Sequence, residues 1–227
     1  MSSKILDEPQ LRNKRFVFED RLHAGRLLSV KLEKYVDRHD VQILAIPAGG
    51  VPVGYEVARN LNLPLDLIVV RKIQIPWNPE AGFGALSWDG TTVLNIPLVR
   101  RLDLSSETID RSISLARENV QHRLRKFRGA RPFPILEDKT VLLVDDGLAS
   151  GFTMLVAAKS TKGYKPERII VAVPTASLNS VELVAPNVDE LICLNIRSGP
   201  IFAVADAYQR WHDLTDKEVK EWLNKTA

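Results

Sequence analysis

Short apolar runs recur along the chain, and segments with a helical pattern lie between them. The runs are bounded by glycine, proline and polar residues, which is typical of strands. They do not alternate between apolar and polar residues, as expected for parallel strands that helices cover on both faces. We predict strands over residues 41–47, 65–71, 140–145, 168–174 and 188–195. The pattern indicates an α/β fold with a mainly parallel, twisted sheet flanked by helices.

The segments around these strands carry helical signals. Helices are predicted over residues 20–36, 52–61, 105–127 and 153–162, with a further helix near the C-terminus. The longest begins with acidic residues, ends with basic residues and is followed by Gly129, in keeping with the helix dipole and a glycine C-cap. The C-terminal helix begins with Thr215 and Glu218 at capping-box spacing.

Residues 73–98 stand apart from this pattern. The segment contains three prolines, three glycines and two tryptophans, and it is too long for an ordinary connection. It is therefore either functional or contains small strands of its own.

The composition fits a folded soluble domain and excludes several classes of protein. Of the 227 residues, 45% are hydrophobic and 26% are charged, close to globular averages. No apolar run is long enough to cross a bilayer, and residues 1–20 lack the apolar core of a signal peptide. A single cysteine cannot form an internal disulfide. We therefore expect a cytoplasmic protein with no membrane partner, and the net charge of +3 permits an anionic ligand.

The clearest chemical signal is the segment 141–153, VLLVDDGLASGFT. A buried strand places Asp145 and Asp146 at its carboxyl end, the edge where open α/β sheets bind ligands. The small-residue loop that follows leads into a helix, where backbone N–H groups and the hydroxyls of Ser150 and Thr153 can cradle a phosphate. The acids are suited to sugar hydroxyls or to a magnesium ion. Taken alone, the acidic pair is also compatible with a solvated turn and a helix cap, although that alternative is the less favoured one.

The whole segment resembles the phosphoribosyl pyrophosphate (PRPP) binding signature of the type I phosphoribosyltransferases. Pro47-Ala48-Gly49-Gly50, directly after a strand, resembles the pyrophosphate loop of these enzymes, which often contains a cis peptide whose second residue is not proline. Arg71-Lys72, at the end of the second predicted strand, resembles their basic pair. Residues 73–98 match the mobile loop and hood that close over the site.

The resemblance extends over nearly the whole chain and is closest to a subgroup of small phosphoribosyltransferase-like proteins. It implies a single domain, 1–227, whose hood is formed by segments near 73–98 and 196–214. It also implies a PRPP-dependent transfer of phosphoribosyl to a nucleobase or related nitrogen acceptor, with release of pyrophosphate, by a homodimer.

The resemblance implies a role for each candidate site residue. Asp145, Asp146 and Lys72 are implied to be catalytic, and the two aspartates to lie at Mg²⁺. The PRPP-binding set is Ala48, Gly49, Gly50, Arg71, Lys72, Gly147, Leu148, Ala149, Ser150, Gly151, Phe152 and Thr153. Phe202 and Tyr208 are implied to sandwich the base, although aromatic residues in such a segment also serve as core.

Two positions depart from the resemblance. Ala48 stands where the subgroup commonly has arginine, which removes a cation expected near pyrophosphate. Ala149 stands where transferases of 6-oxopurines carry an acid, so we do not expect hypoxanthine or guanine as the acceptor.

Two other readings stay open. A PRPP-sensing regulator with the same fold could bind nucleic acid through the basic run Arg123–Arg131, although basic residues are expected at a helix end in any case. A non-catalytic sugar-phosphate binding protein would fit the alanine at position 48. We do not expect nucleic acid as a partner.

Overall fold

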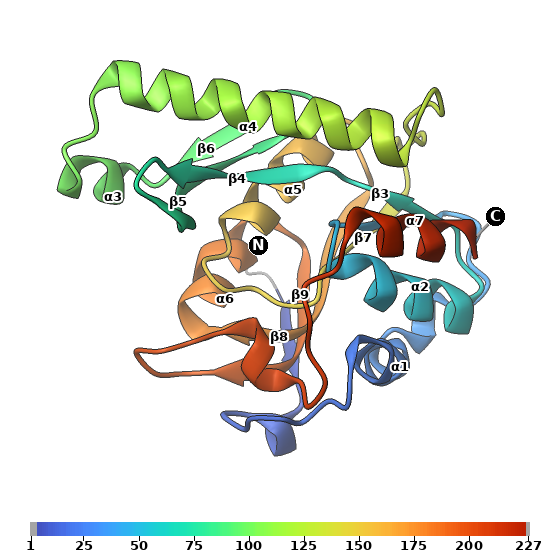
Figure 1. Cartoon of the computed structure of the whole chain (residues 1–227). Coiled ribbons are helices and arrows are strands. Elements are labelled where there is room, and N and C mark those ends of the chain that lie inside the picture. The colour runs from blue at the N-terminus through green and yellow to red at the C-terminus, as the bar shows by residue number, and fades with distance from the viewer. Residues whose placement is uncertain (1–3, 226–227) are drawn as a thin grey trace.

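Six parallel strands form the central sheet of the computed structural model, which describes residues 4–225 (Figure 1). Their order is β1-β9-β8-β7-β2-β3, and every neighbouring pair runs parallel. The strands are β1 (Lys4–Asp7), β2 (Val41–Ala45), β3 (Leu65–Leu67), β7 (Thr140–Val144), β8 (Arg168–Ser177) and β9 (Glu190–Arg197). The predicted α/β fold with a mainly parallel sheet is confirmed.

Helices cover both faces of this sheet. The faces are covered by α1 (Arg21–Lys31) and α2 (Gly50–Leu61) on one side, and by α5 (Phe152–Lys162) and α6 (Leu178–Val184) on the other. Successive residues of β7 point to opposite faces, so Leu142 packs beneath α1 and α2 while Leu143 packs beneath α5. Both faces are apolar, which explains the unbroken apolar runs in the sequence.

A second, antiparallel sheet is formed by the segment that stood apart in the sequence. It contains β4 (Val70–Ile75), β5 (Asn78–Ser87) and β6 (Thr92–Leu94), in that order. The short helix α3 (Ile96–Arg101) follows, and the long helix α4 (Ser106–Phe127) lies across the sheet (Figure 1). Ile73 and Phe83 are fully buried beneath Val120 of α4. The expectation of small strands within residues 73–98 is therefore confirmed.

The predicted strand 65–71 is wrong as a single element. It divides after Leu67, and Val70 begins a strand of the second sheet. The apolar run continues across the division because the chain passes from one core to another. Ile68 packs in the core of the parallel sheet, whereas Val69 packs beneath α4. Sequence also missed β1 and extended the first helix past Lys31, where a 3₁₀ turn begins at Glu33.

The C-terminal helix α7 (Asp216–Asn224) rests on α2. Its predicted capping box is present, with Thr215 and Glu218 exchanging side-chain and backbone hydrogen bonds. The rings of Trp222 and Tyr55 pack with centroids 5.2 Å apart. This contact places the N-terminus of α7 close to the end of α4, where Lys126 Nζ lies 2.7 Å from Asp216 Oδ2.

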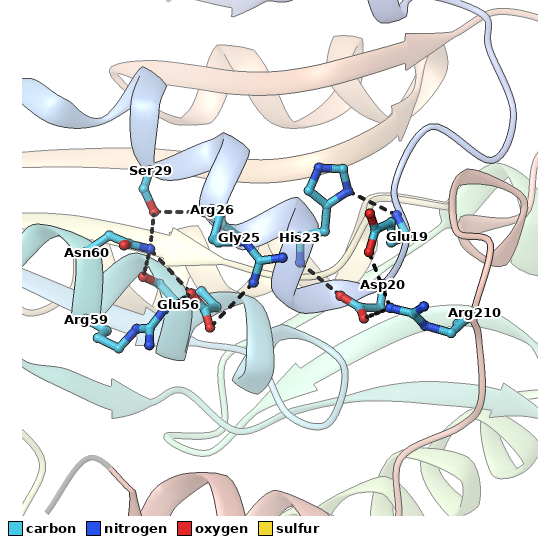
Figure 2. A network of polar contacts seen from close by, with 10 residues as sticks. All are labelled: Glu19, Asp20, His23, Gly25, Arg26, Ser29, Glu56, Arg59, Asn60 and Arg210. Carbon is cyan, nitrogen blue, oxygen red and sulfur yellow. Dashed lines mark hydrogen bonds and ion pairs between the residues drawn. The ribbon is translucent and has the colours of Figure 1, made fainter.

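A network of polar contacts fixes α1 against α2 (Figure 2). Glu56 of α2 is 3% exposed, and its carboxylate lies 2.9 Å from Arg59 and 4.0 Å from Arg26. Gly25 allows this approach, because a Cβ there would lie 2.7 Å from Glu56 Cβ. The contact sets the position of α1 and therefore of Arg21 at its first turn.

The same figure shows how α1 begins (Figure 2). Asp20 caps the helix by accepting from the backbone N–H of His23 at 2.9 Å, and Arg210 lies 2.6 Å from the same carboxyl group. His23 Nδ1 accepts from the backbone N–H of Glu19 at 3.1 Å. These contacts join the start of α1 to the segment that precedes α7. Within residues 4–225, no helix combines the length and apolar character that a bilayer crossing requires.

Candidate active site

Asp145 and Asp146 follow β7 at the carboxyl edge of the parallel sheet, as the sequence predicts, but their side chains have different surroundings. Asp145 lines a cavity of about 390 Å³. Asp146 is not part of that lining; its carboxylate accepts from Arg21 Nε at 2.9 Å. In Figure 1 the second sheet, β4 to β6, lies above the parallel strands. The acidic pair is therefore divided into one group that faces the cavity and one that faces the protein.

Burial controls the protonation of both acids. Desolvation and the neighbouring Asp146 raise the pKa of Asp145 well above its ordinary value. Burial also raises the pKa of Asp146, and the Arg21 guanidinium opposes this rise. Asp145 Oδ1 accepts from the backbone N–H of Asp146 at 2.8 Å, which orients the carboxyl group at the strand end. A cation or a hydrogen-bond donor brought to Asp145 would favour its ionised form.

The loop Gly147–Gly151 is anchored to the end of β8. Leu148 donates its N–H to Thr175 O at 2.9 Å and accepts from the N–H of Ser177 at 3.0 Å. Gly151 has φ of +78° and leads directly into α5, so it supplies a turn that glycine adopts without strain. The first N–H groups of a helix have no partner within the helix. Residues Ser150, Gly151 and Thr153 at this helix start line the cavity.

The loop Pro47–Gly50 lies directly beside the acids. Its Pro47–Ala48 peptide is cis, as in the loop that the sequence resembles. A Cβ on Gly49 would lie 1.8 Å from Asp146 Oδ2, so only glycine permits this approach of backbone to carboxylate. Ala48 packs against the apolar cluster that joins Phe127 to α7.

Arg71 and Lys72 lie on β4 of the second sheet rather than at the end of a parallel strand, which corrects the sequence prediction. Neighbouring residues of a strand point to opposite faces. Lys72 lines the cavity with Asp145, and its ammonium group donates to the backbone oxygen of Glu80. Gly82 makes room for it, because a Cβ there would lie 2.2 Å from Lys72 Cγ. Burial lowers the pKa of Lys72, and the charge of Glu80 opposes this effect.

Arg71 points to the side of α4. Burial is the main cause that lowers the pKa of Arg71, followed by repulsion from Arg123, while Asp216 acts in the opposite direction. Of the basic pair, only Lys72 lines the cavity with Asp145, and both residues line a second cavity beside α4.

Comparison with known proteins agrees with this arrangement. Residues 19–205 match the family described as the phosphoribosyl transferase domain. The chain belongs to this family. Two curated relatives from Mycobacterium tuberculosis, strains CDC 1551 and H37Rv, carry provisional phosphoribosyl transferase names and are each 35% identical over 209 residues. The match covers 92% of this chain and 47% of each relative, so the chain spans about half their length.

Solved structures show the same fold. The protein TT1426 from Thermus thermophilus is 34% identical, with a TM-score of 0.74, and the match covers 92% of this chain and 99% of that one. The AQ2163 protein from Aquifex aeolicus is 10% identical, with a TM-score of 0.51 and coverage of 83% and 78%, which shows the fold alone.

Most of the signature expected for this family surrounds one cavity. Its lining includes Lys72, Asp145, Gly147, Leu148, Ala149, Ser150, Gly151 and Thr153. The other expected PRPP-binding residues, Ala48, Gly49, Gly50, Arg71 and Phe152, lie outside this lining. Phe152 packs against the core next to α5.

Neither of the two residues predicted to stack on the base, Phe202 and Tyr208, lines the cavity. Tyr208 is 1% exposed and packs against Phe18 and Trp211, and its hydroxyl donates to Asp146 O at 2.6 Å. A base cannot stack on a ring enclosed in this way, so that role for Tyr208 is wrong. Phe202 lies 5.1 Å from the Arg197 guanidinium and is not in the cavity lining. The residue of this segment that lines the cavity is Val204.

Arg21 is the other residue that sequence reasoning did not assign to the site. It meets Asp146 across 125 positions of the chain, donates to His212 O at 2.9 Å and stacks 3.9 Å from the Trp211 ring. The partners of Arg21 lie far from it in the sequence, so no local sequence pattern predicts these contacts. The only signal in the sequence is that Arg21 lies at the start of a predicted helix.

Proposed function

We propose that this protein binds PRPP and transfers its phosphoribosyl group to a nitrogen acceptor, with release of pyrophosphate. The observation that carries the proposal is one cavity with a carboxyl group, a helix N-terminus and a lysine on its wall, contributed by Asp145, by the start of α5 and by Lys72. These three groups match the sugar, the 5′-phosphate and the pyrophosphate of one ligand.

The 5′-phosphate is assigned to the start of α5. Ser150, Gly151, Phe152 and Thr153 offer backbone N–H groups at a helix N-terminus, which favours negative charge. The anchoring of Leu148 to β8 holds the loop in place before a ligand arrives. Binding therefore needs little ordering of the protein.

The sugar hydroxyls are assigned to Asp145. Its carboxyl group faces the cavity, whereas Asp146 is held by Arg21. Asp146 is therefore assigned a positioning role, since it fixes the start of the loop and the backbone beside Gly49.

Mg²⁺ fits this set of residues through one carboxylate. Among the described residues, no group of three or more His, Cys, Asp or Glu side chains could hold a metal ion. Mg²⁺ keeps several waters and commonly combines one or two carboxylates with phosphate oxygens of the substrate. Asp145 would hold the ion against PRPP oxygens, and the ion would neutralise charge on the pyrophosphate.

Breaking the bond between ribose C1 and the pyrophosphate oxygen leaves positive charge on the sugar and an electron pair on the leaving group. Lys72 on the cavity wall is assigned to stabilise the leaving group, and the Ala48–Gly50 backbone is assigned to the same group on the basis of the family resemblance. The acceptor nitrogen then forms the new bond to C1. We keep Lys72 as a catalytic residue on this basis.

A hood is proposed over the cavity from two distant segments of one domain. Glu80, Ala81 and Gly82 of β5 line one part, and Val204 lines another. These residues fall within the expected segments 73–98 and 196–214. Closing them together would exclude water, which competes with the acceptor for the activated sugar.

The acceptor is assigned only as a nitrogen compound. Ala149 lines the cavity and offers no acid for proton exchange with a purine base. A homodimer in the cytoplasm remains an expectation from the family resemblance, and size-exclusion chromatography with light scattering tests the dimer.

The basic run Arg123–Arg131 does not favour nucleic-acid binding. Lys126 is paired with Asp216, and Arg128 with Asp66. Arg131 donates to the backbone oxygen of Phe127 at 3.0 Å. These contacts engage part of the run within the protein, while Arg125, Lys126 and Arg131 stay exposed.

The test combines binding and turnover. PRPP with Mg²⁺ should raise the melting temperature of the wild-type protein, because a ligand that binds only the native state stabilises it. Pyrophosphate should then appear when one member of a nucleobase panel is added. Absence of PRPP stabilisation would overturn the proposal. If PRPP stabilises the protein but no member of the panel causes release of pyrophosphate, the protein would instead be a non-catalytic sugar-phosphate binding protein.

A further inference from the structure

The second cavity, beside α4, has a volume of about 470 Å³. One wall is a single face of α4, because its lining residues, among them Thr108, Ser112 and Asn119, recur at helical spacing. The other wall is β4 and the turn that follows it, which lie beneath α4 in Figure 1. The volume falls within the range of small-molecule sites, about 300–1,000 Å³.

The lining of this cavity carries positive charge that no lining acid neutralises. Arg71 and Arg111 both belong to it, and among residues 4–225 no aspartate or glutamate does. Over the same residues, neither guanidinium makes a hydrogen bond or an ion pair. Arg71 is half-buried, and burial lowers its pKa, while Asp216 opposes this effect from outside the lining. An anion in the cavity would favour the charged form of Arg71, so the cavity is suited to an anionic ligand.

The turn between β4 and β5 adds an aromatic ring to the cavity. Trp77 lies in this turn and lines the cavity, and 64% of the residue is exposed. Across the part of the chain that the structure describes, its ring stacks on no other aromatic ring. The face of an indole is a good surface for a flat aromatic group.

Two amide side chains line the cavity from opposite walls, and both use their N–H groups within the protein. Gln74 Nε2 donates to Pro79 O at 2.8 Å, and Asn119 Nδ2 donates to Leu115 O at 2.9 Å. These bonds orient each amide, and its carbonyl oxygen can accept hydrogen bonds from a ligand. The amino and ring N–H groups of a nucleobase are donors that match such acceptors.

We propose that this cavity binds a nucleoside 5′-monophosphate. Arg71 and Arg111 bind the phosphate, because arginine forms paired hydrogen bonds with phosphate oxygens, and the base stacks on Trp77. The inference goes beyond the proposed function and does not depend on it. Among the described residues, Lys72 is the only one that lines both this cavity and the catalytic one. A nucleotide bound here therefore lies next to the catalytic cavity and outside it, as a regulatory ligand does.

The experiment titrates AMP, GMP, CMP and UMP separately into the full chain by calorimetry, with PRPP and Mg²⁺ present to occupy the catalytic cavity. At least one monophosphate should bind. Arg111→Ala and Trp77→Ala should each weaken that binding by about tenfold or more, because each removes the partner of one half of the ligand. Ribose 5-phosphate and the matching nucleoside, which each lack one half, should bind at least tenfold more weakly than the monophosphate.

Arg117→Ala is the matched control. Arg117 is an exposed arginine on the same helix and is not part of the lining, so its loss should leave nucleotide binding unchanged. Arg111 is also exposed, and unchanged melting temperatures of the Arg111→Ala and Trp77→Ala proteins would show that both variants are folded.

Three results would overturn the inference. The first is that the wild type binds none of the four monophosphates. The second is that binding is unchanged in either Arg111→Ala or Trp77→Ala, which would place the nucleotide elsewhere. The third is that Arg117→Ala weakens binding as much as Arg111→Ala, which would indicate a general attraction to the charge of α4. A wild type that binds a monophosphate through Arg111 and Trp77 but is not stabilised by PRPP would remove the proposed function and keep this inference.

Discussion

Arg21 Nε lies 2.9 Å from Asp146 Oδ2, and both side chains are largely buried although 125 residues separate them in the chain. This pair connects the first turn of α1 to the acidic end of β7. It also explains why two adjacent aspartates with similar sequence surroundings take different positions. Asp146 is held by the protein, and Asp145 is left to face the cavity.

Replacing Arg21 by methionine should destabilise the fold. The change leaves Asp146 buried without its partner, and breaking a buried pair in this way costs about 3–5 kcal/mol. Urea denaturation measures the loss. Arg26→Met is the control. Arg26 is on the same helix, its side chain is 47% exposed, and it lies 4.0 Å from the carboxylate of Glu56. Equal losses in the two variants would contradict a special role for the Arg21–Asp146 pair.

Asp145→Asn should change how stability depends on pH. The native pKa of Asp145 is raised well above its ordinary value, so the native state keeps a proton that the unfolded chain has already released. Stability therefore falls as pH rises from about 4 toward the native pKa. Asparagine cannot release that proton, so the variant should show a flatter profile and exceed the wild type in stability near neutral pH.

The measurement for Asp145 is urea denaturation at a series of pH values. Asp110→Asn, an exposed aspartate on α4, is the control and should follow the wild-type profile. The same Asp145→Asn protein should lose stabilisation by PRPP, since the sugar and metal contact is gone. A variant that remains folded and keeps the full PRPP effect would remove Asp145 from the site.

Gly49→Ala should impair ligand binding more than it impairs folding. The added Cβ would lie 1.8 Å from Asp146 Oδ2, so either the loop or the Asp146 carboxylate must move. Calorimetry with pyrophosphate and Mg²⁺ should show weakened binding. Gly163→Ala offers a comparison, because Gly163 has φ of −63° and a Cβ there would lie 3.2 Å from its closest neighbour. Unchanged pyrophosphate binding in Gly49→Ala would place the anion elsewhere.

Tyr208→Phe should lower stability by about 1–3 kcal/mol, because it leaves the buried backbone oxygen of Asp146 without its donor. The aromatic ring is retained in this variant. Chemical denaturation and PRPP binding are measured together. A variant as stable as the wild type would show that the hydroxyl does not hold the backbone of Asp146 in place.

The elements that sequence predicted well are those whose signals are local. The 13 residues of the PRPP signature form a buried strand, a turn and a helix start within one continuous segment. Gly151 and the capping box of α7 can be read in the same way, since each depends on residues within one turn. The apolar pattern of a doubly covered parallel sheet is also visible in single strands.

The features that sequence missed depend on contacts between distant segments. The run 65–71 is apolar throughout most of its length, and only the meeting of two cores shows that it divides after Leu67. Tyr208 could be core or platform until its neighbours Phe18 and Trp211 are known. Arg21 carries no local motif, because its partners lie on other elements.

Residues near the C-terminus contact the residues of the site, and this limits how far the chain can be shortened. The family match ends at residue 205, yet Tyr208 and His212 lie beyond it. These residues donate to the backbone of Asp146 and accept from Arg21. A fragment that ends at the family boundary would keep every residue of the PRPP signature and lose the contacts that position them. We therefore expect a fragment that keeps the site in place to extend beyond residue 205.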